Sequence, residues 1–449
     1  MPADPLALLR SRSYLVLLVL AALIGAPISA AAYFFLALVT KLQGWIFSSL
    51  PHALGFHAEP MWWPVLPLLL AGVLVPLSIK YLPGTGGHSP ADGFKAGGFP
   101  RPAELPGVVL AALATLSLGV VLGPEAPLIA LGAGLGVCAI KLVKRDSPDR
   151  VTAMVAAAGS FAAISTLLGS PLLGAFLLME ASGLSGATLE LVLLPGLLAA
   201  GIGSLIFIGL DSATGLGTFS LAIPHLPHLG PPTVGEFGWA LVIGVAAAII
   251  GTGIHRLGLV LRDRTVRWAL LAGPVIGLAI AGLAIAYAAG TGKGSSEVLF
   301  SGQNALGPLI DHASGYTVGA LLLLIVCKSL AYGGSLSSFR GGPTFPAMFV
   351  GAAGGIALSH LPGLPVVAGA AMGIGAMCAV LLRLPLTSVL LATLLLSSDG
   401  LQVMPLAIVA VVVAYVVSAR LIPAAPAEAA EPGRATAAPD TAAAGQPPS

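Results

Sequence analysis

Charge is scarce in this sequence. Lysine and arginine together number 20 and aspartate and glutamate 18 among 449 residues, so charged residues make up 8% of the chain and its formal net charge is +2. Such a small excess gives no electrostatic basis for binding nucleic acid, and we expect no nucleic-acid partner. Histidine (8) and cysteine (3) are also sparse, and neither shows the spacing of metal ligands, so we expect no metal and no cofactor.

Catalytic constellations are missing as well. An intramembrane enzyme would need paired acids, a histidine-based metal cluster, or a nucleophile with its base. The histidines are scattered along the chain, and no two acids share a helix face in the apolar runs. We therefore expect that the protein is not an enzyme.

What the sequence has in abundance is apolar residues. They make up 57% of the chain, the mean hydropathy is +0.99, and many apolar runs approach the ~20 residues that cross a bilayer. These features predict an all-α polytopic membrane protein. The run 14–39 is too long for a signal-peptide core and has no clean cleavage site, so it predicts a retained first helix after a cytoplasmic N-terminus, 1–13. Residues 423–449, rich in alanine and proline, are expected to form a disordered tail.

Two stretches of the chain resemble each other. "GPEAPLIALGAGLG" (123–136) and "GPTFPAMFVGAAGG" (342–355) both fit the pattern GPxxPxxxxGAxxG. A second pair, 157–172 and 371–386, follows at nearly the same offset, 214 instead of 219 residues. The chain is therefore expected to consist of two related halves, about 14–212 and 233–421, within one transmembrane domain, 14–422.

Basic residues are distributed unequally between equivalent loops. The loop 141–150 carries four Lys or Arg, whereas its counterpart 359–365 carries none. The reverse holds earlier in each half, where 48–63 has no basic residue and 255–268 has four arginines. By the positive-inside rule both basic loops are cytoplasmic, so the second half is inverted in the membrane relative to the first.

Glycine- and proline-rich breaks interrupt the apolar runs at 82–98, 122–127 and 339–346. Irregular backbone at membrane depth is tolerated only where it is buried or lines a cavity, so helices are expected to begin at mid-membrane. Helix starts present unpaired N–H groups and the positive end of the helix dipole, and several of them together can solvate an anion. Lys328, Arg340 and Arg383, near the ends of apolar runs, are expected to snorkel or to pair with backbone carbonyls, with attraction of anions as the alternative.

These motifs resemble those of the CLC family of chloride channels and proton-coupled chloride transporters, over about residues 14–420. "LGPEAPLIALGA" is similar to the family's G-[KR]-E-G-P segment and places Glu125 at the gating glutamate. "GGPTFPAMFVGAAGG" is similar to the G-x-F-x-P segment, and "GGHSPADG" lies where G-S-G-x-P is expected. "GSPLLGAFLLMEASG" and "RLPLTSVLLATLLLSSDG" resemble two further family segments.

The resemblance implies a homodimer in a lipid membrane, with a separate pathway for chloride or a similar small anion in each subunit. Glu125 would compete with the anion for a site, and protonation would release it. The membrane is expected to be a bacterial inner membrane. The residues implied to bind the anion are Gly87, Ser89, Gly123, Pro124, Ala126, Pro343, Thr344 and Phe345.

The chain departs from the family pattern at several positions. Aligning "GGHSP" on its proline leaves open which hydroxyl meets the anion, and the role of His88 is also open. "SSDGLQVMP" (397–405) lacks the expected tyrosine of the inner gate. Ala181 stands where the family's exchangers carry an inner glutamate, and the adjacent Glu180 is the remaining candidate for a proton path. Proton coupling is therefore expected to be weak or absent.

Two other readings remain open beside anion transport of this kind. A chloride/proton antiporter would share the same anion site. A secondary transporter of another small solute would be favoured by paired acids or by an unwound segment rich in carbonyl groups, and the isolated Glu125 argues against it.

Overall fold

The computed structural model describes residues 9–94, 99–184, 186–221, 230–396 and 400–421. Within these ranges the chain is helical, and no strand is formed apart from one isolated antiparallel bridge. The expected tail 423–449 and residues 397–399 of the "SSDG" segment lie outside the described residues. The described part of the chain contains six helical segments long and apolar enough to cross a membrane: Arg12–Ala53, Glu125–Val143, Leu189–Thr214, Val234–Thr291, Val318–Ser338 and Gln402–Leu421.

The first set of elements covers residues 12–214. It consists of α2 (Arg12–Gly44), the π-helix η1 (Trp45–Ser49), α3 (Leu50–Ala53), α4 (Val65–Tyr81), the 3₁₀ turns η2 (Pro90–Asp92) and η3 (Pro102–Glu104), α5 (Leu105–Ser117), α6 (Glu125–Val143), α7 (Asp149–Ala163), α8 (Pro171–Ser182) and α9 (Gly186–Thr214).

The second set covers residues 234–421. It consists of α10 (Val234–Thr265), η4 (Val266–Trp268), α11 (Ala269–Thr291), η5 (Ser295–Glu297), α12 (Gln303–Asp311), η6 (Ala313–Gly315), α13 (Val318–Ser338), α14 (Thr344–Leu358), α15 (Val366–Leu382), α16 (Pro385–Leu394) and α17 (Gly400–Leu421).

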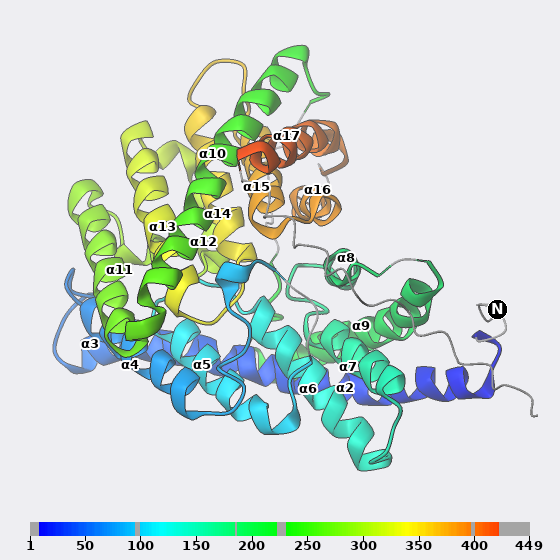
Figure 1. Ribbon diagram of the computed structural model, residues 1–449. Coiled ribbons are helices and arrows are strands. Elements are labelled where there is room, and N and C mark those ends of the chain that lie inside the picture. The colour runs from blue at the N-terminus through cyan, green and yellow to red at the C-terminus, as the bar shows by residue number, and fades with distance from the viewer. Residues whose placement is uncertain (1–8, 95–98, 185, 222–229, 397–399, 422–449) are drawn as a thin grey trace, which may run out of the picture.

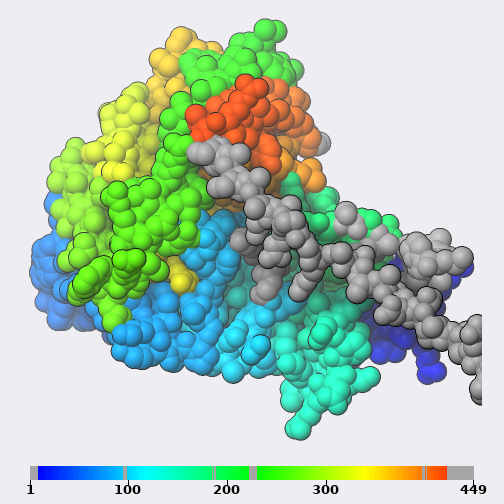
Figure 2. All heavy atoms as spheres, in the orientation of Figure 1, coloured from blue at the N-terminus to red at the C-terminus, as the bar shows by residue number. Residues whose placement is uncertain are grey.

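The two sets occupy different parts of the molecule. In the view of Figure 1 the helices α2 to α9 fill the lower part and the right, whereas α10 to α17 fill the upper part and the left. Figure 2 shows the same division on the surface of this face, with blue and cyan residues below and green to red residues above. The transition lies between the end of α9 and the start of α10.

Equivalent helices begin at equivalent residues of the sequence repeat. α6 begins at Glu125 and α14 begins 219 residues later at Thr344, which is the offset of the first motif pair. α8 begins at Pro171 and α16 begins 214 residues later at Pro385, which is the offset of the second pair. Proline at the first helical position fits these starts, because its missing N–H is not needed there. The repeat seen in the sequence therefore determines where the helices start.

The same helix crossing occurs in both sets. α6 packs on α7, and α14 packs on α15. A Cβ atom on Gly132 would collide with the carbonyl oxygen of Gly159, and a Cβ on Gly351 would collide with that of Gly373, its repeat equivalent. Small residues at both crossings allow the helix backbones to approach closely, which is how helices associate in apolar surroundings.

The three expected breaks are present, and several helices are short. Among the described residues, no α-helix lies between Tyr81 and Leu105, between Ser117 and Glu125, or between Ser338 and Thr344. Apolar helices of 10–17 residues, such as α8 and α16, are shorter than the ~20 residues needed to span a bilayer. The prediction of helices that begin away from the ends of a span agrees with this arrangement.

One expectation about the loops was wrong. Residues 255–268 do not form a loop, because α10 continues to Thr265 and η4 follows directly. Arg256 therefore lies within a helix, and Arg262 and Arg264 lie in its last turn, where positive charge complements the helix dipole. The other basic segment, 141–150, was also predicted to be a loop. Only its centre, 144–148, is one, since α6 ends at Val143 and α7 begins at Asp149.

Candidate functional site

Two helix starts from the two sets meet at the centre of the candidate site. The residues just before α6 and α14 pair with each other, because Gly123 N donates to Gly342 O and Gly342 N donates to Gly123 O, both at 2.7 Å. These two glycines are equivalent in the repeat. A contact in which residue i meets j and j meets i is what a two-fold relation between two copies produces.

Glu125 connects the two helix starts. It is the first residue of α6 and is completely buried. Its Oε1 accepts a hydrogen bond from the backbone N–H of Thr344, the first residue of α14 and the repeat equivalent of Glu125. The carboxylate of one helix start therefore occupies the anion-binding end of the other helix, where N–H groups and the dipole favour negative charge.

Glycine makes room for this carboxylate. A Cβ on Gly342 would collide with the carboxylate and Cγ of Glu125, and a Cβ on Gly123 would lie 2.9 Å from the Cδ of Glu125. Neither glycine has a positive φ angle, so the space, not the backbone conformation, requires glycine at these positions. The two glycines of GPxxP thus serve the site directly.

Two further oxygen atoms at this position have no hydrogen-bond partner among the described residues. They are Oε2 of Glu125 and Oγ1 of Thr344, both completely buried. If the carboxylate moved away, the N–H and the hydroxyl of Thr344 would both be available to an anion in its place. Unpaired buried polar atoms are costly in a folded protein, and they gather here at a helix start.

The sequence reading missed Tyr332 of α13. Its side chain is buried, and its hydroxyl donates to the carbonyl oxygen of Pro343 at 2.7 Å, one residue before α14. This bond holds Pro343, the residue that precedes Thr344 and the start of α14. No local signal identifies it, because Tyr332 lies 11 residues upstream of Pro343 in an apolar helix.

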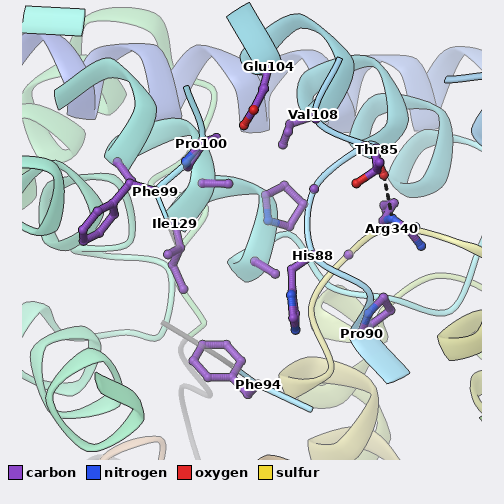
Figure 3. Close-up of a pocket in the computed structure, with 18 of the residues that line it drawn as sticks. Thr85, His88, Pro90, Phe94, Phe99, Pro100, Glu104, Val108, Ile129 and Arg340 are labelled. Carbon is purple, nitrogen blue, oxygen red and sulfur yellow. Dashed lines mark hydrogen bonds between the residues drawn. The ribbon is translucent and has the colours of Figure 1, made fainter. Parts of the chain in front are cut away.

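A cavity of about 400 Å³ lies on one side of the site. We call it the Arg340 cavity. Its walls come from the loop after α4, the start of α6, and the segment that leads into α14, and Figure 3 shows Arg340 beside Thr85 with His88 and Glu104 on other parts of the wall. The residues on its wall include Thr85, Gly87, His88, Glu104, Ala126, Arg340 and Pro343.

A second cavity of about 390 Å³ adjoins the residues just before Glu125. We call it the Gln303 cavity. Leu122 and Pro124 lie on its wall, together with residues from the end of η5 to the start of α12 and part of α2. Glu125 itself lines neither cavity, since it is completely buried. Pro124 and Ala126, on either side of Glu125 in the sequence, thus face different cavities.

The predicted anion-binding residues divide between these surroundings. Gly87, Ala126 and Pro343 line the Arg340 cavity, and Pro124 lines the Gln303 cavity. Ser89 lines neither cavity, and its buried Oγ has no partner among the described residues. The remaining three, Gly123, Thr344 and Phe345, lie around the carboxylate. Gly123 leaves space for it, the backbone N–H of Thr344 donates to it, and the ring of Phe345 lies beside Gly123.

Glu180 has a different position. Its carboxylate accepts hydrogen bonds from Leu386 N at 2.9 Å, from Thr387 N at 2.7 Å and from Thr387 Oγ1 at 2.6 Å. It therefore caps the start of α16 from the neighbouring α8. Glu180 does not line the Arg340 cavity or the Gln303 cavity.

Lys328 of α13 is completely buried and pairs with carbonyl groups, as its position near the end of an apolar run suggested. Its Nζ donates to the carbonyl oxygens of Glu297, Val298, Leu299 and Phe300, at 2.9 to 3.4 Å. These four residues follow one another along the wall of the Gln303 cavity or directly behind it. The lysine thus fixes the shape of that wall. In the described ranges no group of three or more His, Cys, Asp or Glu side chains could hold a metal ion.

Comparison with known proteins identifies the family to which this chain belongs. The family model described as "Voltage gated chloride channel" matches residues 79–419. Proteins of Escherichia coli strains, among them E24377A and K12 / DH10B, named "Putative ion-transport protein YfeO", are 29% identical over 363 residues, which is 79% of this chain and 82% of theirs.

Solved structures share the fold at lower identity. A slow cyanobacterial Cl⁻/H⁺ antiporter is similar with a TM-score of 0.70 and 20% identity, over 90% of this chain and 94% of that one. A CLC-type fluoride/proton antiporter gives 0.64 and 19%, over 90% and 95%. A eukaryotic CLC transporter gives 0.67 and 15%, over 92% and 73%. With the family match over most of its length, this chain is an integral membrane protein that belongs to the voltage-gated chloride channel, or CLC, family of anion transporters.

Proposed function

We propose that the protein moves chloride or a similar small anion along a path from the Arg340 cavity to the Gln303 cavity, and that Glu125 is the gate. The observation that carries this proposal is the carboxylate of Glu125 at the start of α14, on the N–H of Thr344. An anion on the path needs the same N–H group, so carboxylate and anion exclude each other. Protonation removes the charge that holds the side chain there, and flux then rises as the pH falls.

The test is chloride efflux from proteoliposomes over a pH series. Glu125→Gln and Glu125→Ala lack the ionisable group, so we expect efflux at neutral pH to reach the level that the unmodified protein shows only at acidic pH. Glu190→Gln, an exposed acid on α9, is the matched control and keeps the original pH dependence. Glu125 variants with the unmodified pH response would exclude Glu125 as the gate.

We further propose that proton coupling is weak or absent, because Ala181 offers no proton acceptor and Glu180 is engaged in capping α16. A chloride/proton antiporter is the second candidate. It is favoured by the functions named for two of the similar structures, a Cl⁻/H⁺ antiporter and a fluoride/proton antiporter. Both candidates use the same anion site and differ in whether protons move in fixed ratio to chloride.

The setting of this activity is part of the proposal. We propose a homodimer in a bacterial inner membrane, with two inverted halves, about 14–212 and 233–421, and with 144–148 and η4 on the cytoplasmic side. The Escherichia coli relatives and the basic residues at both places support this setting. Labelling of single cysteines at Arg145 and Arg267 in intact cells tests the orientation, and labelling of both from outside would overturn it. Light scattering in detergent tests the dimer.

A further inference from the structure

Arg340 has no role in the gate described so far, yet it faces the cavity beside it. It lies between α13 and α14 and lines the Arg340 cavity. Its Nε donates to Thr85 O at 3.2 Å and its Nη1 to Phe339 O at 3.1 Å, while its backbone N donates to Thr115 Oγ1 at 3.3 Å. These bonds hold the guanidinium at the wall, as Figure 3 shows for the bond to Thr85.

The guanidinium has no acidic partner among the described residues. No described carboxylate lies within 4.0 Å of it. The ion pairs found in the described ranges are those of Arg262 with Asp92 and with Asp263. Glu104 on the wall of the same cavity caps a turn by accepting from Arg101 N at 3.0 Å. A partly buried charge without a counter-charge is costly. Asp92 acts on Arg340 only from beyond the 4.0 Å of an ion pair, so no described carboxylate in direct contact balances the guanidinium.

Arg340 also contacts a loop of unusual backbone conformation. Gly84, Thr85, Gly86 and Gly87 have φ angles of 83°, 49°, 69° and 92°, so four residues in a row adopt the left-handed region. Thr85 is the one without glycine's freedom there, and its carbonyl oxygen is the acceptor for Arg340 Nε. Positive φ costs free energy for a residue with a Cβ, so an additional bond is needed to keep Thr85 in place.

The charge is unevenly placed along the proposed path. Of the described residues that line the two cavities, Arg340 is the only Lys or Arg, and Pro124, not a basic residue, precedes Glu125. The Gln303 cavity carries an acid, Glu297, and neutral polar groups. A fixed positive charge in a cavity of low dielectric raises the local concentration of anions. Two N–H groups of the Arg340 guanidinium are already bonded to carbonyl oxygens, so the remaining N–H groups bind an anion without enclosing it.

We propose that Arg340 is a binding residue for small inorganic anions in the Arg340 cavity, where it concentrates them before they reach Glu125. This inference rests on the proposed anion path and adds to it a residue that supplies charge. The site is too large for one bare halide at about 400 Å³, so the anion enters it with part of its hydration shell. Such partial hydration keeps binding weak enough for the anion to leave.

The first test measures binding without transport. The purified full-length protein in detergent is heated in sodium gluconate with increasing sodium chloride at constant ionic strength, and the chloride concentration that gives half of the maximal rise in Tm is recorded. For Arg340→Met and Arg340→Gln we expect this concentration to rise at least tenfold. For Arg340→Lys we expect it to stay within about threefold, and Arg267→Met, on exposed η4, leaves it unchanged.

The glutamine variant separates charge from positioning. Its amide can still donate to Thr85 O, so a role limited to holding the loop predicts that Arg340→Gln behaves like the unmodified protein. That result would overturn the proposal, as would a half-point for Arg340→Met equal to that of the unmodified protein. If Arg340→Met fails to fold, Arg340→Gln and Arg340→Lys still give opposite expectations.

The second test measures chloride efflux from proteoliposomes for the same variants. We expect Arg340→Gln to need at least tenfold more chloride for half-maximal efflux while the maximal rate stays within about threefold. An efflux half-point that stays unchanged would overturn the role of Arg340 in transport. Absence of chloride efflux from the unmodified protein would contradict the proposed function instead, and the Tm series would still decide whether Arg340 binds anions.

Discussion

Gly123 and Gly342 exchange two backbone hydrogen bonds of 2.7 Å, and the carboxylate of Glu125 lies against both of them. The pairing fixes the distance between the starts of α6 and α14. The space beside it is filled by a single acidic side chain. A substitution that fills this space is therefore expected to displace Glu125, the proposed gate, before it disturbs the helices.

Gly342→Ala should displace the carboxylate of Glu125 without removing it. The added Cβ would occupy the position of the carboxylate, and the backbone conformation of Gly342 is open to alanine because its φ is not positive. We expect chloride efflux from proteoliposomes to become less dependent on pH, in the direction of Glu125→Ala. Gly354→Ala, in the following helix α14, is the control, because nothing lies within 4 Å of a Cβ on Gly354. An unchanged pH profile for Gly342→Ala would contradict the proposed position of the gate.

Glu180→Gln should act on stability more than on transport. The carboxylate accepts three hydrogen bonds at the start of α16, and glutamine keeps one acceptor oxygen but loses the charge that complements the helix start. Loss of a helix cap costs about 1 kcal/mol, so we expect a lower Tm in detergent. The pH dependence of chloride efflux should stay as it is. A change in that pH dependence at constant Tm would show that Glu180 carries protons.

Lys328→Met should disturb the Gln303 cavity. It removes the donor for four carbonyl oxygens, those of residues 297–300, and each buried acceptor without a partner costs about 1–3 kcal/mol. We expect a marked fall in Tm, measured by thermal unfolding in detergent. Lys141→Met, an exposed lysine near the end of α6, should leave Tm almost unchanged. Equal Tm values for the two variants would mean that the carbonyls find other partners.

Proton coupling is tested by one recording. Liposomes that contain the purified protein are given a chloride gradient, and external chloride and pH are followed together. We expect chloride to move without an accompanying uphill movement of protons, since Ala181 cannot accept a proton and Glu180 caps α16. Protons driven against their gradient at a fixed ratio to chloride would establish the antiporter instead. Valinomycin with potassium, which removes the membrane potential, serves as the control for passive proton leak.

Much of the fold could be predicted from the sequence because the repeated motifs consist largely of glycine and proline. The motif GPxxP marks the start of α6 and of α14, and the prolines at 171 and 385 mark the starts of α8 and α16. Proline and glycine restrict or permit backbone conformations locally, so their effect does not depend on distant residues. The basic segment 255–268 misled for a related reason. Charge predicts a position near the membrane surface, but arginine is also a good helix former, and α10 continues through it.

The contacts of the candidate site could be predicted only in part. Glu125 stood out because an acid in an apolar run is energetically costly, and such residues are therefore candidates for a functional role. Three contacts of the site join residues that are not neighbours in the chain. They are the hydrogen bonds from Thr344 to Glu125, from Tyr332 to Pro343 and from Arg340 to Thr85. Such contacts depend on how the helices are packed, and no local pattern in the sequence encodes them.

The pairing of Glu125 with Thr344 has a consequence for the direction of transport. The two residues hold equivalent places in the repeat, and a scaffold with the same side chain at both would treat ions from either face alike. Here one helix start carries a tethered negative charge, and the other carries a short neutral hydroxyl. A nearly symmetric fold thereby acquires a polarity, and we expect the current–voltage relation of protein inserted in one orientation to rectify.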